Sequence, residues 1–289
     1  MIGMSLRETS TAFRLFIRLL ELAVSALFGF FQSCLAGLSG IIGLRRENRL
    51  VVLTYHIVND EQKAAFSSQM DHLLKAGQAV FANACGNSSA GGRRIAVTFD
   101  DGYQSILRNA LPVLQEKGIP SVIFITTKYM GQRPGWIQDP GNPYREQTLI
   151  SGEQLQSLRN GLVKVGSHTH SHAQLGKLDR EALCEELLLS KGALERLLTR
   201  DVDLLSLPYG SMNRDTLRCC RAAGYRTLFL NVPFPNTVEE DVRIVGRTHV
   251  SAEDWAMEYH LKLRGAYDWI AATYGLKKKI KSLNPTFYR

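Results

Sequence analysis

Short apolar runs alternate with amphipathic stretches along most of this 289-residue chain. The runs end at polar, glycine or proline residues, which is typical of buried strands. The stretches between them repeat apolar residues at three- and four-residue spacing, which predicts helices. The expected strands cover residues 51–56, 95–97, 121–126, 162–167, 204–207, 225–230 and 242–250. The expected helices cover residues 66–76, 104–117, 179–198, 214–223 and 252–274, and a further helix opens at Ser151.

This order gives at least seven strand–helix alternations and no internal sequence repeat. Such alternation is typical of α/β proteins with a parallel sheet. We therefore expect an α/β fold, a distorted (β/α)7–8 barrel with an N-terminal hydrophobic segment. The expected domains are a membrane-associating segment of residues 1–47 and a barrel domain of residues 48–289 that ends in a basic tail.

The N-terminal segment has the length and apolar character of a membrane element. Residues 22–44 carry no charged side chain, and about 20 apolar residues are enough to cross a bilayer. Several glycines and Gln32 interrupt the stretch, so an orientation along the membrane interface is an alternative. A buried helix of a soluble domain is a second alternative. A signal peptide is disfavoured because no convincing cleavage site follows.

The charge balance indicates an anionic partner. The net charge is +8, and no nucleic-acid-binding motif accompanies it, so we expect a membrane surface and no nucleic acid. A C-terminal cluster of Lys277, Lys278, Lys279 and Lys281 would add to binding at an anionic leaflet, with a solvated tail as the alternative.

The cysteines bear on the compartment. Their number, five, is odd, and no C-x-x-C pair occurs, so we expect free or buried thiols and no disulfide framework. They are Cys34, Cys85, Cys184, Cys219 and Cys220. This usage favours a reducing compartment. We therefore expect a membrane-associated protein at the bacterial inner membrane, with the cytoplasmic face slightly favoured over the periplasmic one.

The candidate chemistry lies at two strand ends. Asp100 and Asp101 follow the apolar run of residues 95–97, and three histidines at residues 168, 170 and 172 follow the apolar stretch of residues 162–165. Polar residues at the carboxyl ends of parallel strands are where α/β folds place active sites. An aspartate with two histidines is a ligand set for a divalent ion with open coordination positions. The neighbouring aspartate would remain free as a base.

These segments resemble motifs of the NodB-homology polysaccharide deacetylases, carbohydrate esterase family four. The motifs are T-F-D-D-G at residues 98–102, H-[ST]-x-x-H at residues 168–172 and P-[YF] at residues 208–209, and the resemblance extends from about residue 50 to residue 250. The resemblance implies that Asp101, His168 and His172 bind a divalent metal ion, with zinc expected. It also implies that Asp100 is the general base that activates a metal-bound water.

Further roles follow from the same resemblance. The backbone N–H of Tyr209 is expected to stabilise the oxyanion, with a core aromatic residue as the alternative. The family's late leucine-rich segment ending in a histidine, its usual general acid, has no close counterpart here, so His249 in the segment of residues 247–250 is the nearest candidate, with an ordinary strand histidine as the alternative. His56 is expected near the floor of the site, with a core histidine as the alternative. His170 is a rival metal ligand if residues 168–172 are extended, whereas a helical turn would pair His168 with His172.

One departure from the family pattern concerns the base. The family often has an arginine two residues before the motif proline, and this position is Ser206 here. Another residue must then orient Asp100, and Arg243 and Arg247 are the candidates.

We expect a polysaccharide deacetylase, a hydrolase acting on carbon–nitrogen bonds other than peptide bonds. It would remove N-acetyl or O-acetyl groups from a sugar, a polysaccharide or a lipid-linked sugar. A non-catalytic glycan-binding relative is the main alternative. A glycosidase is disfavoured because it would leave the histidine cluster without a purpose. The Gly- and Pro-rich residues 130–147, with Trp136 and Tyr144, are expected to form a loop at the mouth of the site, with a disordered connector as the alternative.

Overall fold

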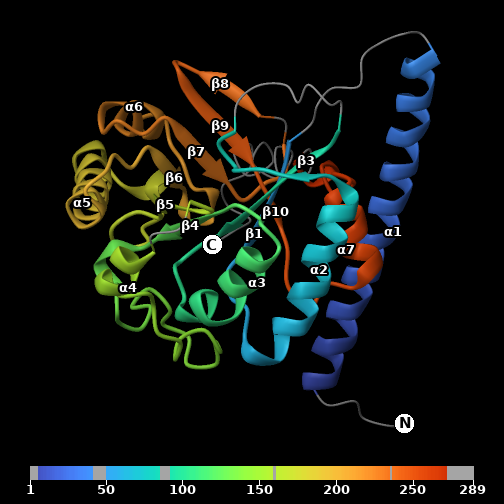
Figure 1. Ribbon diagram of the computed structural model, residues 1–289, viewed down its shortest axis with the longest axis horizontal. Coiled ribbons are helices and arrows are strands. Elements are labelled where there is room, and N and C mark those ends of the chain that lie inside the picture. Colours follow the sequence, from blue (N-terminus) through green and yellow to red (C-terminus); the bar gives the residue numbers. More distant parts are fainter. Residues whose placement is uncertain (1–5, 42–49, 85–91, 159–160, 235, 272–289) are drawn as a thin grey trace. The chain divides into compact units, whose positions relative to one another are not determined.

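Parallel strands form the centre of the computed structural model, which describes residues 6–41, 50–84, 92–158, 161–234 and 236–271 (Figure 1). The chain divides into two compact units. One contains residues 48–254, and the other joins residues 1–47 to residues 255–289.

The larger unit is built on one sheet. The strand order is β10-β1-β3-β4-β5-β6-β7-β9-β8, and β2 pairs with β3 outside this order. All pairs are parallel except the antiparallel pair of β8 and β9. The strands are β1 (Leu50–Tyr55), β2 (Gln78–Ala79), β3 (Arg94–Phe99), β4 (Ser121–Ile125), β5 (Val163–Ser167), β6 (Leu204–Ser206), β7 (Thr227–Leu230), β8 (Thr237–Glu239), β9 (Val242–Gly246) and β10 (Thr248–His249).

The two ends of the sheet are linked through the chain itself. β9 pairs with β7, β10 pairs with β1, and Arg247 alone separates β9 from β10. One extended segment therefore pairs with β7 near one end of the strand order and with β1 near the other, as a distorted barrel requires. The expected fold class is confirmed, although the hydrogen-bonded order of the described strands does not close on itself.

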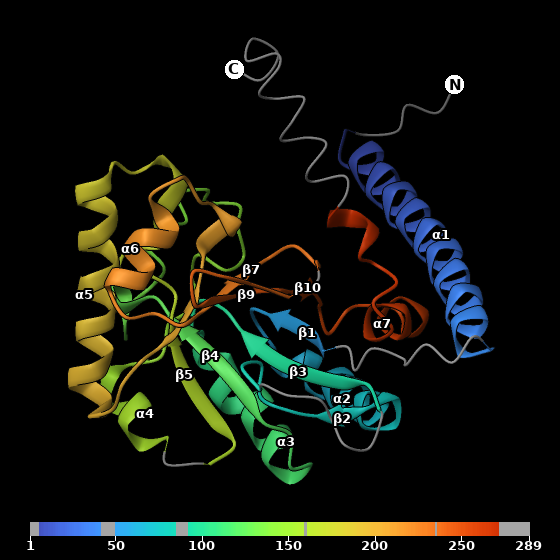
Figure 2. The ribbon, with the colours of Figure 1, turned by 90° about the horizontal axis from the view of Figure 1, so that it is seen from above.

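Helices cover the outside of the strands (Figure 2). They are α2 (Lys63–Ala76), α3 (Leu111–Glu116), α4 (Gly152–Ser157), α5 (Arg180–Leu198) and α6 (Thr216–Ala222). Asp179 caps α5 by accepting a hydrogen bond from the Ala182 N–H at 2.9 Å. The expected single helix of residues 104–117 is divided, because a π-helical turn, Ile106–Ala110, precedes α3.

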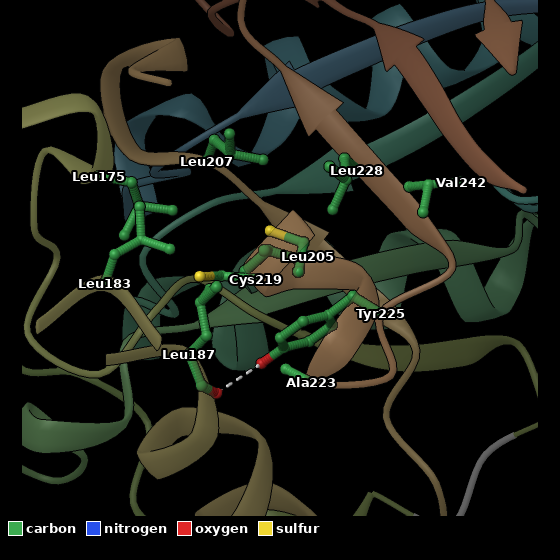
Figure 3. Packing of buried hydrophobic residues seen from close by; sticks show 11 residues of the cluster. Leu175, Leu183, Leu187, Leu205, Leu207, Cys219, Ala223, Tyr225, Leu228 and Val242 are labelled. Carbon is green, nitrogen blue, oxygen red and sulfur yellow. Dashed lines mark hydrogen bonds between the residues drawn. The ribbon is translucent and has the colours of Figure 1, made fainter. Parts of the chain in front are cut away.

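Every residue of β1, β3 and β4 is buried, which explains their continuous apolar character. Inside the barrel, Phe124 and Phe229 pack with ring centroids 5.0 Å apart. A second core lies between the sheet and α5 and α6, where the Tyr225 hydroxyl donates to the Leu187 carbonyl at 3.3 Å (Figure 3).

The expectation of free thiols is wrong for two cysteines. Cys184 on α5 and Cys219 on α6 form a disulfide across 35 residues of sequence, with Cα atoms 5.3 Å apart. The packing of the two helices brings them together, which sequence spacing does not indicate. Cys220 is buried and Cys34 exposed, both as free thiols, and Cys85 lies outside the described residues.

The smaller unit contains α1 (Leu6–Ile41) and α7 (Ala256–Leu263). Among the described residues, Leu15–Leu35 of α1 is the one stretch long and apolar enough to cross a membrane, and 6% of it is buried. A membrane anchor and a signal sequence both fit this observation. The basic cluster of residues 277–281 lies outside the described residues.

Candidate active site

The expected site residues converge on one cavity of about 510 Å³ at the carboxyl ends of the strands. Its lining includes His56, Asp101, Tyr103, Trp136, His168, His172, Tyr209, Asn231 and His249. Asp100 is fully buried behind this lining. The cavity therefore gathers residues from the segments that follow β1, β3, β5, β6 and β7, together with His249 of β10, at one end of the sheet.

Asp101, His168 and His172 form a compact group with a metal-ligand composition. Asp101 Oδ1 lies 3.4 Å from His168 Nε2 and 3.2 Å from His172 Nε2, and all three side chains are buried. Ligands about 2.1 Å from a tetrahedral metal ion lie about 3.4 Å from one another. Burial alone would raise the pKa of Asp101, but hydrogen bonds with His168 and His172 lower it. The three groups thus fit a divalent cation.

Contacts beyond the three ligands fix their orientation. His168 Nδ1 donates to the Ser206 carbonyl at 2.9 Å, which leaves Nε2 as the lone-pair atom that faces Asp101. The ring of His172 stacks on Trp136, with centroids 4.4 Å apart and planes 15° apart. Ser171 donates from its N–H and its hydroxyl to Glu186 on α5, which fastens the loop between the histidines.

The backbone of this loop is neither helical nor extended. Thr169 and His172 have φ angles of 67° and 64°, and Asp101 has a φ of 67°. Left-handed conformations of this kind cost about 1–3 kcal/mol each and persist where the surroundings enforce them. His170 is turned away and contacts Thr127 Oγ1 through Nδ1 at 3.0 Å. His170 as a rival ligand is therefore wrong.

Gly102 follows the aspartate pair for steric reasons. Its φ is 82°, and a Cβ at this position would lie 2.7 Å from Ile125 Cδ1. Glycine thus lets the T-F-D-D-G turn pack on β4 without backbone strain at this point.

Asp100 is held by an arginine from the segment between β9 and β10. Arg247 Nη1 donates to Asp100 Oδ1 at 2.7 Å, and Nη2 donates to Oδ2 at 2.6 Å. Burial alone would raise the pKa of Asp100, but the charges of Arg247 and His168 and the hydrogen bonds from Arg247 lower it well below its usual value. The carboxyl group is therefore ionised at neutral pH.

Arg247 also binds Ser206, which occupies the position where the family often has an arginine. Arg247 Nη2 donates to Ser206 Oγ at 2.7 Å and to Asn231 Oδ1. Arg243 instead donates to the carbonyls of Asn83 and Ala84, so Arg247 is the candidate that contacts Asp100.

The remaining candidates border the cavity. Tyr209 follows Pro208 with a φ of 58°, and its ring lies edge-on to His172 with centroids 4.9 Å apart. His249 in β10 is exposed, and its ring centroid lies 5.5 Å from that of His56. The imidazoles of His56 and His249 thus both border the cavity at this edge.

The expected loop at the mouth of the site is confirmed. Residues 136–139, 142 and 144 line the cavity, and the turns that precede them follow β4 directly. Tyr144 lies against Tyr103, with ring centroids 6.1 Å apart. The rim is therefore rich in aromatic side chains.

A family model described as polysaccharide deacetylase matches residues 87–228, which include all three motifs. The chain belongs to the polysaccharide deacetylase family. Of the curated relatives, the deacetylase-family protein YxkH of Bacillus subtilis is 24% identical over 157 residues, 54% of this chain and 51% of that one. The poly-β-1,6-N-acetyl-D-glucosamine N-deacetylase of Staphylococcus aureus is 26% identical over 143 residues, 46% of each chain. The chain thus spans about half the length of the curated relatives it matches.

Solved structures share the fold of this deacetylase-family chain. IcaB from Ammonifex degensii has a TM-score of 0.61 at 23% identity, covering 75% of this chain and 98% of that one. The polysaccharide deacetylase BC0361 from Bacillus cereus has a TM-score of 0.60 at 21% identity, covering 74% and 68%. At these identities the likeness concerns the fold.

Sequence reasoning missed several contacts of this deacetylase-family site. Asn231 and Tyr103 border the cavity, yet neither belongs to a motif. Tyr103 only follows the T-F-D-D-G motif directly. The Trp136 stack on His172 joins residues that no local pattern links. The loop's aromatic content was the one available signal.

Proposed function

We propose that the chain is a metal-dependent deacetylase that hydrolyses the acetamido group of an N-acetylated glycan. One observation carries the proposal. Three buried metal-type ligands line one cavity, and a buried, ionised Asp100 lies behind them, next to Asp101 in the chain. Family membership supports the same reaction class.

Asp101, His168 and His172 would hold the metal ion, and their composition suits zinc. A divalent ion in such a site supplies Lewis-acid polarisation of a carbonyl oxygen and lowers the pKa of water. The hydrogen bond from His168 Nδ1 to the Ser206 carbonyl supports this assignment, since it presents Nε2 as a ligand.

Asp100 would accept the proton of the attacking water. A carboxylate has about four acceptor sites, and Arg247 and Ser206 fill three of them among the described residues. The ion pair with Arg247 keeps the carboxyl deprotonated, which a base requires. General-base catalysis of this kind contributes roughly 10²–10⁴-fold to the rate.

Tyr209 and His249 complete the proposed machinery. The strained turn after Pro208 would direct the Tyr209 N–H at the oxyanion of the tetrahedral intermediate. His249 would give a proton to the departing amine, since amide hydrolysis needs an acid for its leaving group. Its neighbour His56 lines the same edge and is the second candidate for this step.

The rim supports a sugar substrate. Trp136 and Tyr144 offer aromatic faces to a pyranose ring, and Gln138, Asp139 and Asn142 offer polar groups beside them. The name of the Staphylococcus aureus relative suggests β-linked N-acetyl-D-glucosamine as the first substrate to try.

The test is acetate release from N-acetylglucosamine oligomers, lipid-linked N-acetyl sugars and an O-acetylated glycan. We expect acetate release from an N-acetylated substrate. A chelator should abolish this release, and added zinc should restore it. Glycan binding with bound metal and no acetate from any substrate would instead favour the non-catalytic relative. The intact Arg247–Asp100 pair speaks against decay of the site.

We propose further that the smaller unit places the enzyme at a membrane, with residues 1–47 as the associating segment. The Cys184–Cys219 disulfide favours an oxidising compartment, and hence the periplasmic side of the bacterial inner membrane, over the cytoplasmic face. Labelling of an introduced tail cysteine on intact cells with a membrane-impermeant reagent decides the side.

A further inference from the structure

α1 has a polar side and an apolar side. Its polar side packs against α7 and the residues that follow α7. Arg18, Leu22, Ser25 and Gly29 recur at helical spacing and contact α7 and the residues after it. This stripe divides α1 into a covered side and an outer side.

The covered side is held by polar contacts. Arg18 donates to Glu258 Oε2 through Nε at 2.9 Å and Nη2 at 2.6 Å, and Lys262 binds the other Glu258 oxygen at 2.9 Å. Ser25 is fully buried and accepts a hydrogen bond from Trp269 Nε1 at 2.9 Å.

Close packing accompanies these polar contacts. A Cβ on Gly29 would lie 3.1 Å from Ala266 Cβ, so glycine allows the near approach of the two segments. The Arg18 guanidinium also lies over the Trp255 ring, 4.3 Å from its centroid.

The outer side is continuously apolar. Six large side chains on this side are exposed between 49% and 72%: Phe16, Leu19, Leu20, Leu27, Phe30 and Phe31. The polar residues of the Leu15–Leu35 stretch lie on the half of the helix centred on the α7 contact. Monomeric soluble proteins rarely expose an apolar face of this extent.

We infer that α1 lies in the plane of a membrane, with its outer side in the acyl-chain boundary and its polar side, sealed by α7, toward the headgroups. A spanning α1 would carry the Arg18–Glu258–Lys262 cluster into hydrocarbon, where charged groups are costly. The in-plane orientation keeps this cluster at the headgroup level. Trp255 and Trp269 lie where amphipathic rings are favoured. The chain's net charge of +8 fits an anionic surface.

The inference rests on the membrane association proposed above and is tested with the full chain by spin-label depth measurement. In a background with Cys34→Ser and Cys85→Ser, one cysteine at a time is introduced by Phe16→Cys, Leu20→Cys, Leu27→Cys or Phe31→Cys, with Glu21→Cys as the polar-side control. The proteins are bound to phosphatidylethanolamine–phosphatidylglycerol vesicles. An in-plane helix gives the outer sites one shared depth of about 5–10 Å and leaves residue 21 accessible to a water-soluble quencher.

Depth that peaks near residue 25 and falls toward both ends would show a spanning helix and overturn the inference, while membrane association stood. Absence of vesicle binding, or a dimer through α1, would overturn both. As a matched pair, Leu27→Glu should weaken vesicle binding by roughly tenfold, because burial of one leucine is lost. Leu188→Glu, at an exposed leucine of α5, should leave it unchanged. Acetate release by the same variants reports the deacetylase proposal separately.

Discussion

Arg247 and Asp100 form a two-point ion pair in which neither side chain has any exposed surface. Arg247 lies between β9 and β10, which pair with β7 and β1 near the two ends of the sheet, so the position of Asp100 depends on how the barrel is completed. The guanidinium also packs against the rings of Phe124 and Phe229. Arg247 therefore both orients the Asp100 carboxylate and packs in the interior of the barrel.

Removing the charge of Arg247 should uncover the effect of burial on Asp100. In Arg247→Met the pKa of Asp100 should rise, since burial raises it and the opposing charge is gone. The base would then be protonated to a higher pH, so the acidic limb of the kcat/KM profile should move upward. At neutral pH we expect a loss of roughly 10²-fold. The pH–rate profile is the measurement.

The same change should reduce the free energy of unfolding by roughly 3–5 kcal/mol, because one partner of a buried pair is removed. Arg243→Met is the matched control, since that arginine binds backbone carbonyls away from Asp100. An unmoved acidic limb in a folded Arg247→Met protein would show that Asp100 is not the titrating base.

Ser206→Ala should have a small effect. It removes one hydrogen bond with Arg247 and a longer one with Asp100, while the two-point pair remains. We expect a loss of about 0.5–1.5 kcal/mol in unfolding free energy and a change in kcat of less than about tenfold. Chemical denaturation and steady-state kinetics measure these two quantities. A loss as large as that of Arg247→Met would make the serine the main support of the base.

Trp136→Ala should weaken metal retention and sugar binding together. The indole stacks on His172 and also lines the cavity. Loss of a residue that supports a ligand reduces metal affinity by about 10–100-fold. Competition with a chelator and KM for a glycan oligomer measure the two effects. Trp136→Phe, which keeps an aromatic face, should restore most of both; if it does not, stacking is not the cause.

The sequence could predict those parts of the fold and of the site that depend on local patterns of apolar and polar residues. Asp101, His168 and His172 each follow an apolar run, and parallel strands place their carboxyl ends together. Arg247 was one of two candidates for the base's partner, because no local pattern fixes a contact across 147 residues. The direction of His170 could not be predicted, because Thr169 before it has a left-handed backbone conformation. Threonine seldom adopts this conformation, and no sequence pattern indicates it.

The disulfide was missed for a related reason. Cys184 and Cys219 face each other only because α5 and α6 pack side by side. The roles of Asp100, Tyr209 and His249 stay predictions, since the structure shows their positions and not their chemistry.

Peptide mapping without reductant should recover Cys184 and Cys219 as one linked peptide. The Cys184→Ser variant should lose roughly 2–4 kcal/mol of unfolding free energy and keep its site, which lies on other elements. Burial raises the pKa of Cys220 to about 12, so native alkylation should spare it and modify the exposed Cys34. Recovery of Cys184 and Cys219 as free thiols from the natural host would contradict the oxidising compartment.

Asp100 and Asp101 are adjacent carboxylates with two different proposed roles, and metal analysis combined with turnover measurement tests this division most directly. Asp101→Ala, His168→Ala and His172→Ala should each lose the bound metal ion and all acetate release, because each removes one of three ligands. Asp100→Asn should keep stoichiometric metal and lose turnover by roughly 10²–10⁴-fold. If Asp100→Asn loses its metal as completely as Asp101→Ala, or keeps full turnover, the assignment of base and ligand is wrong.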